Sequence, residues 1–332
     1  MRAVVITKHG PPEVLQVQER PAPRAGDGDV AIDVAAAGVN FADIMARQGL
    51  YEAAPKPPSV IGYEVSGTVT EVGGDVDGIA PGDRVIAGTR FNGYQERAVA
   101  RAADVIPLPA AMSFEQGAAI PVNYSTAYAG LIRFGSLPEG GRVLIHAAAG
   151  GVGIAATQIA RRHGAEIYGT ASPGKHDAIR GFGVDHPLDY TQPDWERGLP
   201  TFDLVMDAIG GKSFATSYGL LRPGGVLVCF GASAVVSGEK RNVVQAVRTL
   251  MQMPKFKPRD MMEESKTVVG LNALALWDEW GSLGPIIGPL VDLIGDGTVQ
   301  PVVSDAVPFA NAPEAHRIIQ QRRNVGKVVL VP

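Results

Sequence analysis

The sequence predicts an α/β protein in which a doubly wound parallel sheet is joined to a smaller β-rich part. The first observation is length: 332 residues, 45% of them hydrophobic, exceed what one compact core usually holds, so two domains are the default. The second is a change near residue 121 from short strand-like runs to alternating strands and helices. The third is a glycine-rich turn at residues 147–153, between an apolar run and a helix-compatible segment.

The first 120 residues have the pattern of an all-β region. Short apolar or alternating runs are separated by turns rich in proline and glycine, which is typical of a barrel or sandwich. One helix is expected at residues 41–48, with Asn40 as a candidate N-cap. Strands are expected at residues 3–7, 30–37, 65–72, 84–87 and 95–100.

From residue 121 onward the alternation of strands and helices favours a parallel, doubly wound sheet. Strands are expected at residues 142–147, 166–170, 204–207, 225–230 and 266–271, and helices at 154–163, 176–181, 213–220 and 241–251. The C-terminal part is expected to contain helices at 286–294 and 312–322 and strands at 302–308 and 327–331.

The glycine-rich turn has the spacing Ala148-x-Gly150-x-x-Gly153, a variant of G-x-G-x-x-G with alanine in first place. In a strand–turn–helix unit such a turn lets the backbone approach a pyrophosphate, and the helix N-terminus offers it free N–H groups. The motif alone is a weak signal, because glycine-rich turns also occur in α/β proteins that bind no nucleotide. Further glycines, Gly210, Gly211 and Gly231, follow two later strands at the edge where a nucleotide would pass.

The residues after the second strand of this unit indicate which nicotinamide nucleotide it binds. NAD-binding units carry an Asp or Glu about 20 residues past the turn, where it binds the ribose hydroxyls. Here the strand at 166–170 is followed by Ser172 and Lys175 and by no carboxylate, which suits a 2′-phosphate and predicts NADPH. An ordinary polar loop with a surface lysine is the alternative. Tyr190 could stack on adenine or contact the same phosphate.

Composition excludes several classes of protein. A net charge of −4 and a pI near 5.9 give no electrostatic footprint for nucleic acid. The single cysteine, Cys229, excludes a disulfide framework and a cysteine-rich zinc site. We expect a soluble, cytoplasmic protein without membrane insertion, since no signal peptide, membrane span or basic amphipathic helix is evident.

Eight stretches together carry a family resemblance over essentially the whole chain: GVNFAD (38–43), GLY (49–51), PSVIGYEVSGTVTEVG (58–73), GDRV (82–85), NYSTAY (123–128), AAAGGVG (147–153), LRPGG (221–225) and NVGKVVL (324–330). With them the chain resembles the medium-chain dehydrogenase/reductase superfamily, and within it the zinc-free quinone oxidoreductases. Residues 230–276 resemble the vesicle-amine-transport-like branch. The resemblance implies a GroES-like β-barrel catalytic domain at 1–121 and 273–332, a Rossmann domain at 122–272, and a homodimer joined edge to edge through the strand at 266–271.

Two departures from the zinc-dependent alcohol dehydrogenases decide the chemistry that the resemblance implies. Those enzymes carry a cysteine where this chain has Asn40 and a histidine where it has Tyr63, so we predict no metal. Without a Lewis acid, the substrates that remain possible are those that accept a hydride unaided, namely quinones and activated alkenes. The candidate catalytic residues are Asn40, Asp43, Tyr51 and Tyr63. In related enoyl-thioester reductases a tyrosine at the position of Tyr51 is implicated as proton donor.

Each of these residues also has a structural interpretation: Asn40 as a helix cap, Asp43 as a tie within its loop, Tyr63 as packing, and Glu64 as a buried hydrogen-bonding residue. For the cofactor, the resemblance places glycine-turn residues at the pyrophosphate, two residues at the nicotinamide ribose, polar residues at the 2′-phosphate, and strand-end residues around the nicotinamide. In that order they are Ala149, Gly150, Gly151, Val152 and Gly153; Thr126 and Tyr128; Thr170, Ser172, Lys175 and Tyr190; and Ile209, Phe230, Gly231, Leu271, Asn272 and Asn324.

Three functions follow from this reading. The first is NADPH-dependent reduction of quinones by hydride transfer from the nicotinamide without metal. The second is reduction of activated alkenes, such as enones, enals or enoyl thioesters, by NADPH. The third is a membrane-associated regulatory protein that binds NADPH and turns it over slowly.

Overall fold

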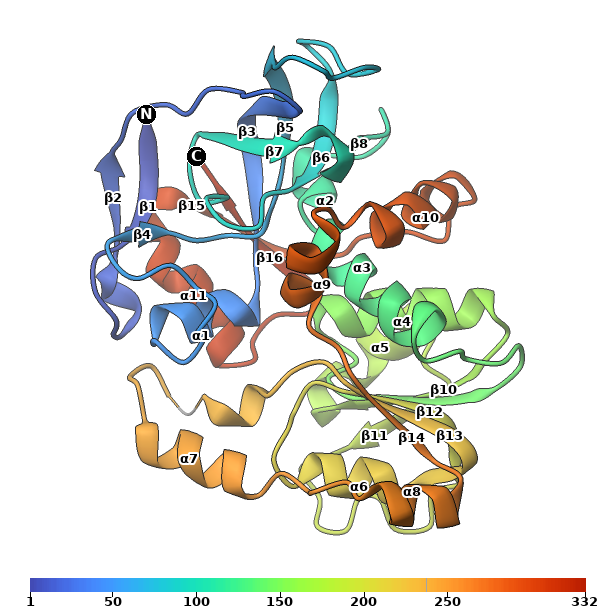
Figure 1. Ribbon diagram of the computed structural model, residues 1–332. Coiled ribbons are helices and arrows are strands. Elements are labelled where there is room, and N and C mark those ends of the chain that lie inside the picture. The colour runs from blue at the N-terminus through green and yellow to red at the C-terminus, as the bar shows by residue number, and fades with distance from the viewer. Residues whose placement is uncertain (237) are drawn as a thin grey trace.

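The computed structural model describes residues 1–236 and 238–332 and shows two lobes, each built around its own sheet (Figure 1). One lobe contains a six-stranded parallel sheet, and the other contains a seven-stranded sheet with a three-stranded sheet beside it. The predicted fold class, a Rossmann-type parallel sheet with a GroES-like β domain, is confirmed.

In the parallel sheet the strand order is β11–β10–β9–β12–β13–β14. Successive side chains of a strand point to opposite faces, and here both faces are covered. Val143 and Ile145 belong to one core cluster, and Leu144 belongs to a different one. The strands are β9 (Arg142–Ile145), β10 (Glu166–Ala171), β11 (His186–Asp189), β12 (Phe202–Asp207), β13 (Leu221–Cys229) and β14 (Thr267–Gly270).

The second lobe joins the two ends of the chain. β16 pairs antiparallel with β3, Val329 opposite Gly38, so the last strand completes a sheet begun near the N-terminus (Figure 1). Its larger sheet contains β3 (Asp29–Val39), β5 (Glu64–Val72), β6 (Arg84–Gly88), β7 (Arg97–Arg101), β8 (Val105–Pro107), β15 (Val303–Pro308) and β16 (Lys327–Val331). The smaller sheet contains β1 (Arg2–Ile6), β2 (Leu15–Glu19) and β4 (Ser59–Val60).

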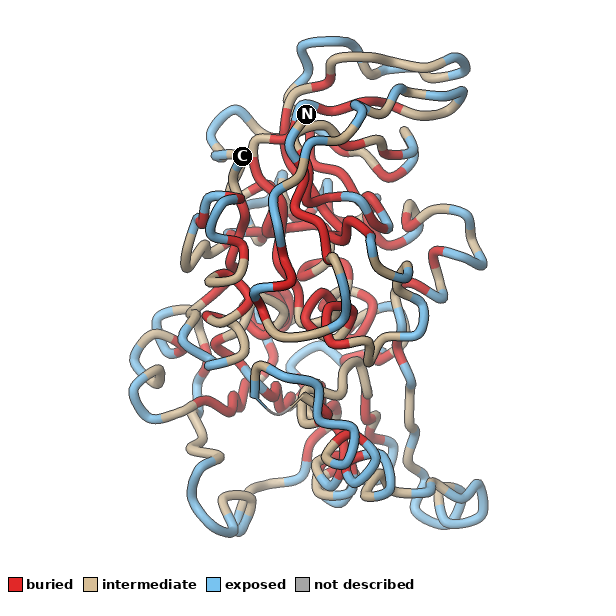
Figure 2. The backbone as a smooth tube through the Cα atoms, turned by 90° about the vertical axis from the view of Figure 1, so that its left-hand side faces the viewer, coloured by how far each residue is buried: buried red, intermediate tan, exposed pale blue. Residues whose placement is uncertain are grey.

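Helices cover the parallel sheet and bridge the lobes. Trp277, Leu283 and Ile286, from α9, α10 and the turn between them, are buried in the same core as the α3 and α4 side chains. One core cluster joins the lobes, since Ile86 and Ile106 of the β-rich lobe belong to the same cluster as Val143, and buried residues lie in both lobes (Figure 2). The helices are α1 (Phe41–Arg47), α2 (Phe114–Gly117), α3 (Pro121–Tyr128), α4 (Gly151–Arg162), α5 (His176–Phe182), α6 (Ser213–Gly219), α7 (Val243–Met251), α8 (Pro258–Glu264), α9 (Ala273–Trp280), α10 (Gly284–Gly295) and α11 (Ala312–Gln320).

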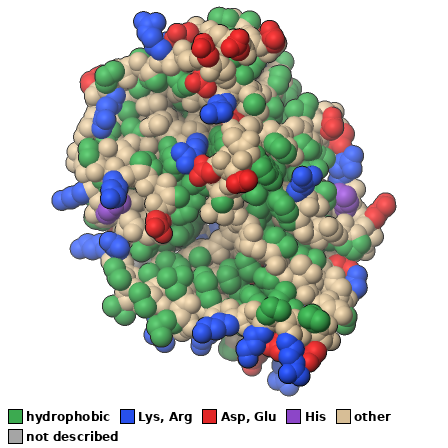
Figure 3. Space-filling model, viewed as in Figure 1, with side chains coloured by type: hydrophobic (Ala, Val, Ile, Leu, Met, Phe, Trp, Pro, Cys, Tyr) green, Lys and Arg blue, Asp and Glu red, His purple; other side chains and the backbone are tan. Residues whose placement is uncertain are grey.

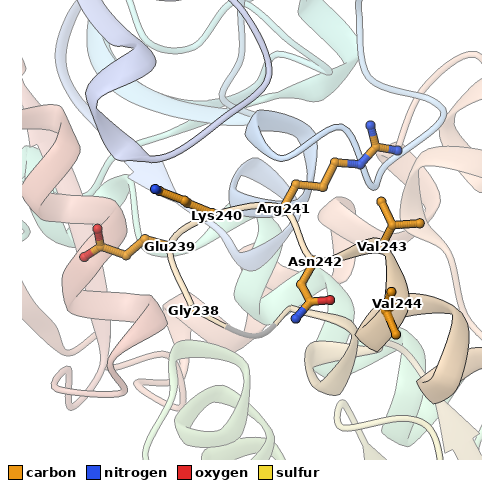
Figure 4. A pocket seen from close by; sticks show the side chains of 7 residues that line it. All are labelled: Gly238, Glu239, Lys240, Arg241, Asn242, Val243 and Val244. Atoms are coloured by element: carbon orange, nitrogen blue, oxygen red, sulfur yellow. The ribbon is translucent and has the colours of Figure 1, made fainter.

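One surface helix, α7, presents an apolar face outward, and its single basic side chain is Arg248. In α7, Val244 and Met251 are 80% and 81% exposed, whereas Ala246 and Thr249 on the other face are buried. Residues 240–259 contain six basic side chains and no Asp or Glu: Lys240, Arg241, Arg248, Lys255, Lys257 and Arg259. Lys240 and Arg241 lie in the segment that leads into α7 (Figure 4). Apolar side chains gather over this part of the surface in the space-filling view (Figure 3).

Two expectations from the sequence stay predictions: the domain boundaries at residues 121 and 272, and the homodimer. β14 lies at the edge of the parallel sheet, where a second copy could pair with it. In the described part of the chain, no helix is both long enough and apolar enough to span a bilayer.

Candidate functional site

The glycine-rich turn has the geometry expected of a pyrophosphate site. Gly150 is the N-cap of α4, and Ala147, with φ of 53°, turns the chain out of β9. The Gly150 N–H donates to the Ala147 carbonyl at 2.9 Å, whereas the N–H groups of Val152 and Gly153 have no acceptor in the described part of the chain. A Cβ on Gly151 would lie 2.4 Å from the Asn123 side chain. The turn therefore needs glycine for packing and leaves the N–H groups of Val152 and Gly153 for an anion.

A short segment from the C-terminal part of the chain lies directly against this turn. We call it the C-terminal loop, residues 321–326, between α11 and β16. The Gly326 N–H donates to the Ala149 carbonyl at 2.9 Å, and Gly326 forms a parallel β-bridge with Gly150. The Asn324 side chain donates to the Gly326 carbonyl at 2.8 Å. Asn324, predicted beside the nicotinamide, thus lies next to the glycine turn.

The residues predicted at the 2′-phosphate lie together just beyond β10, and the structure adds Arg322 to them. The Arg322 Nη1 donates to the Tyr190 hydroxyl at 3.1 Å, and its guanidinium lies 5.8 Å from the Tyr190 ring centroid. The Lys175 ammonium donates to the carbonyls of Arg322 at 2.7 Å and Asn324 at 2.6 Å. Partial burial and the neighbouring Arg322 lower the pKa of Lys175. Within the described residues neither cation forms a salt bridge to a carboxylate, so both remain available to an anion.

Sequence reasoning missed Arg322 because its partner Tyr190 is 132 residues away. The signal was present as a short basic run, Arg322 and Arg323, immediately before the matched stretch NVGKVVL.

The carboxyl ends of the neighbouring strands are held by a buried polar network around Asp207. Its carboxylate accepts from the Ile209 N–H at 2.7 Å and from the hydroxyls of Ser213 at 2.6 Å and Ser217 at 2.7 Å. The Ser217 hydroxyl also lies 3.0 Å from the His146 Nε2. Burial lowers the pKa of His146, against the opposing field of Asp207, so the imidazole is neutral near neutral pH.

Some of the remaining predicted cofactor residues contact this network, and others lie outside it. Thr170 accepts from the Ala147 N–H at 3.1 Å, and the Phe230 N–H donates to the Asp207 carbonyl at 3.1 Å. A Cβ on Gly231 would lie 2.9 Å from the Ala208 carbonyl, so two loops pass closely there. Leu271 is buried, and the Asn272 side chain accepts from the Leu274 N–H as the N-cap of α9. Thr126 and Tyr128 are half-buried on α3.

At the position vacated by the zinc ligands, the structure has a buried triad of Asn40, Glu64 and Lys327. The Asn40 amide donates to Glu64 Oε1 at 2.8 Å and accepts from the Lys327 ammonium at 2.5 Å. Lys327 also donates to Glu64 Oε1 at 2.5 Å, and Glu64 Oε2 accepts from the N–H of Val122 at the start of α3. Glu64 is fully buried and Lys327 is 4% exposed. Asn40 therefore begins α1 as predicted, but both ends of its side chain are engaged by the ion pair.

These residues do not fit a zinc ion. Zinc sites use thiolate, imidazole and carboxylate donors in tetrahedral array. Here an ammonium group lies between the amide of Asn40 and the carboxylate of Glu64. No group of three or more His, Cys, Asp and Glu side chains among the described residues is placed to hold a metal.

Asp43 lies one turn into α1 and is fully buried. Its carboxylate accepts from the Asn40 N–H at 2.8 Å, the Gly62 N–H at 3.1 Å and the Tyr94 hydroxyl at 2.9 Å. Burial raises the pKa of Asp43 to about 7, although the bonds to Asn40 and Tyr94 and the charge of Lys327 oppose the shift. These contacts favour its structural interpretation, a tie between α1 and the turn at Gly62.

The two predicted tyrosines share an apolar cluster with Phe91 and Leu274. Tyr63 is 7% exposed, its ring centroid is 5.2 Å from that of Phe91, and its hydroxyl has no partner among the described residues. Tyr51 is half-buried. Burial and the charge of Asp43 raise the pKa of both phenols, so both are neutral donors near neutral pH. An unpartnered buried hydroxyl next to a half-buried one suits a site that receives a polar acceptor.

A parallel sheet with a glycine turn, a GroES-like domain and an ion pair at the vacated zinc position define an oxidoreductase of the medium-chain dehydrogenase/reductase superfamily. Two family models match: the alcohol dehydrogenase GroES-like domain at residues 26–110 and the zinc-binding dehydrogenase at residues 182–330. The chain belongs to the zinc-free quinone oxidoreductase and VAT-1 branch of this superfamily, which confirms the resemblance found in the sequence.

Three known proteins illustrate this membership. The synaptic vesicle membrane protein VAT-1 homolog of Homo sapiens is 37% identical over 340 residues, covering 100% of this chain and 86% of that protein. The structure of Escherichia coli quinone oxidoreductase complexed with NADPH has a TM-score of 0.85 and 29% identity, covering 100% of both chains. The structure of the CurK enoyl reductase has a TM-score of 0.85 and 26% identity, covering 99% of this chain and 98% of the other.

Proposed function

We propose that this protein reduces quinones with NADPH, by hydride transfer that uses no metal. The observation that carries the proposal is a pair of cations: Lys175 lies just beyond β10, where a carboxylate would indicate NAD, and Arg322 contacts Tyr190. The similarity to the E. coli quinone oxidoreductase complexed with NADPH supports the same cofactor and acceptor class.

The chain's own residues would bind and orient the reactants. The free N–H groups at the start of α4 bind the pyrophosphate, and Lys175 and Arg322 bind the 2′-phosphate. When bound, the nicotinamide supplies the hydride, and a quinone needs in addition only a proton to become a hydroquinone. The neutral phenols of Tyr51 and Tyr63, which share a cluster with Phe91 and Leu274, would be the proton and hydrogen-bond donors.

Reduction of activated alkenes is the second candidate, and the same two phenols favour it. An alkene that accepts hydride at one carbon needs a proton delivered to the other, whereas a quinone oxygen can take its proton from water. The similarity to the CurK enoyl reductase supports this candidate. With Tyr51→Phe, enone reduction should be lost and quinone reduction kept if Tyr51 donates the proton.

A low-turnover role at a membrane is the third candidate, and the exposed apolar face of α7 with its basic surroundings favours it. The human relative is named a synaptic vesicle membrane protein. NADPH consumption well above background in the presence of a quinone would remove this candidate, and tight NADPH binding without turnover would favour it over the enzyme.

The test is NADPH oxidation measured against a panel of quinones and enones, with NADH in parallel. We expect Arg322→Gln to raise the KM for NADPH about tenfold or more, because one charge-assisted contact to the 2′-phosphate is lost. The matched control is Arg323→Gln, since Arg323 is bound to Glu314 instead. A preference of the wild type for NADH, or equal KM values for NADPH in both variants, would contradict the assignment of the 2′-phosphate site.

A further inference from the structure

We propose that Lys175 is a positioning residue: it fixes the C-terminal loop from which Lys327 reaches the catalytic centre, and so affects turnover even with NADH. The inference rests on the proposed function for its kinetic consequence. It goes beyond that function in giving Lys175 a role that requires no 2′-phosphate.

The hydrogen bonds of Lys175 are the first step. A lysine ammonium has three N–H donors, and two of them are directed at the carbonyls of Arg322 and Asn324, at 2.7 and 2.6 Å. One donor therefore remains for a phosphate. A lysine that served the phosphate alone would extend into solvent, whereas this side chain is bound to a segment 147 residues later in the chain.

The second step is the short, closely held path from Asn324 to Lys327. The Asn324 side chain donates to the Gly326 carbonyl, and the Gly326 N–H donates to Ala149 of the glycine turn. Gly326 has φ of 96°, and a Cβ there would lie 2.4 Å from the Val302 carbonyl. Three residues span at most about 10 Å when fully extended, so a displacement of Asn324 has little chain length in which to be absorbed before Lys327.

The third step is the contact that Lys327 makes at the catalytic centre. Its ammonium holds the Asn40 amide oxygen and Glu64 Oε1, both at 2.5 Å, and Glu64 in turn holds the start of α3. The orientation of Asn40 depends on Lys327, and the position of Lys327 depends on the C-terminal loop. Lys175 fixes this loop from the cofactor side, while Lys327 fixes it from the catalytic side.

A simpler alternative gives Lys175 only the 2′-phosphate, with the contacts of Gly326 sufficient to hold the loop. NADH distinguishes the two interpretations, because it has no 2′-phosphate. If Lys175 binds only phosphate, its removal changes nothing with NADH. If it positions the loop, its removal lowers kcat with NADH as well.

The kinetic experiment compares Lys175→Met, Lys175→Arg and the control Arg323→Gln, with NADPH and NADH and one quinone. We expect Lys175→Met to lower kcat with NADH about tenfold in addition to raising the KM for NADPH. Arginine can donate to two carbonyls at once, so Lys175→Arg should recover much of the kcat. Arg323→Gln should match the wild type. A kcat with NADH in Lys175→Met within twofold of the wild type would overturn the inference.

A second readout needs no nucleotide and no turnover. Amide hydrogen exchange of the nucleotide-free protein should be about tenfold faster or more at residues 324–328 in Lys175→Met. The exchange rate at residues 324–328 should be unchanged in Arg322→Gln, because this substitution keeps the backbone carbonyl of residue 322. Equal protection of the loop in Lys175→Met and the wild type contradicts the inference. If the wild type reduces no quinone, the proposed function fails, and the exchange result alone decides whether Lys175 holds the loop.

Discussion

The two buried polar networks of the candidate site are built from different chemistry; we call the one around Glu64 the catalytic-side network and the one around Asp207 the cofactor-side network. The catalytic-side network contains an ion pair, Glu64 with Lys327, and beside it Asp43, whose pKa burial raises to about 7. The cofactor-side network surrounds Asp207 with backbone N–H groups and serine hydroxyls, and its histidine is neutral. Charge is concentrated where the reaction is proposed to occur, and neutral donors are used where the strand ends need only a fixed shape.

The comparison predicts that breaking the ion pair is the most destabilising change. Glu64→Leu leaves the Lys327 ammonium buried without a counter-charge, and we expect it to lower the free energy of unfolding by about 3–5 kcal/mol. Adding Lys327→Met to Glu64→Leu should recover much of this loss, because the unpaired charge is then removed as well. The free energies of unfolding of the single and the double variant are measured by urea denaturation. A double variant less stable than Glu64→Leu would show that the charge is not the cause.

The second prediction concerns the pH dependence that Asp43 confers. Its pKa is about 7 in the folded state and 3.8 as an ordinary value, so between these pH values the folded state holds a proton that the unfolded state has lost. The contribution of Asp43 to the free energy of unfolding is therefore largest below pH 4, falls as the pH rises toward 7, and is constant above pH 7. The whole change is roughly 2–4 kcal/mol.

Asp43→Asn removes the titrating group and should flatten this part of the stability profile, measured by denaturant unfolding at pH 4.5, 6 and 7.5. Asp207→Asn is the matched variant in the cofactor-side network. If the profile of Asp43→Asn keeps the slope of the wild type, another group is responsible for it.

The two networks also show what could be predicted from sequence. The predicted strands and helices, the glycine turn and Asn40 as the N-cap of α1 all depend on neighbours within a few residues, and the structure contains them, whereas α3, α8 and α9 were not predicted. Lys327 was missed as a member of the catalytic-side network because its partners Asn40 and Glu64 are 287 and 263 residues away. Its position at the start of an apolar strand gives no sign that the ammonium is buried.

The side chain of Asn40 shows the same limit at a residue that was singled out. The sequence indicates a helix start there, and the helix does start there, but a local pattern cannot reveal that the amide is bound by a distant ion pair. The α7 surface is similar: the sequence gives its apolar residues, whereas their exposure depends on what the rest of the chain leaves uncovered.

The smallest expected effect tests whether the cofactor-side network is cooperative. Ser217 is fully buried and serves both Asp207 and His146, whereas Ser213 serves Asp207 and is half-buried. Ser217→Ala should therefore lower the free energy of unfolding by about 1–3 kcal/mol, because two polar groups lose a partner, and Ser213→Ala should lower it by about 1 kcal/mol. Both are measured by urea unfolding at pH 7.5. Equal losses would mean that His146 gains nothing from Ser217, and that the network is a set of independent bonds to one carboxylate.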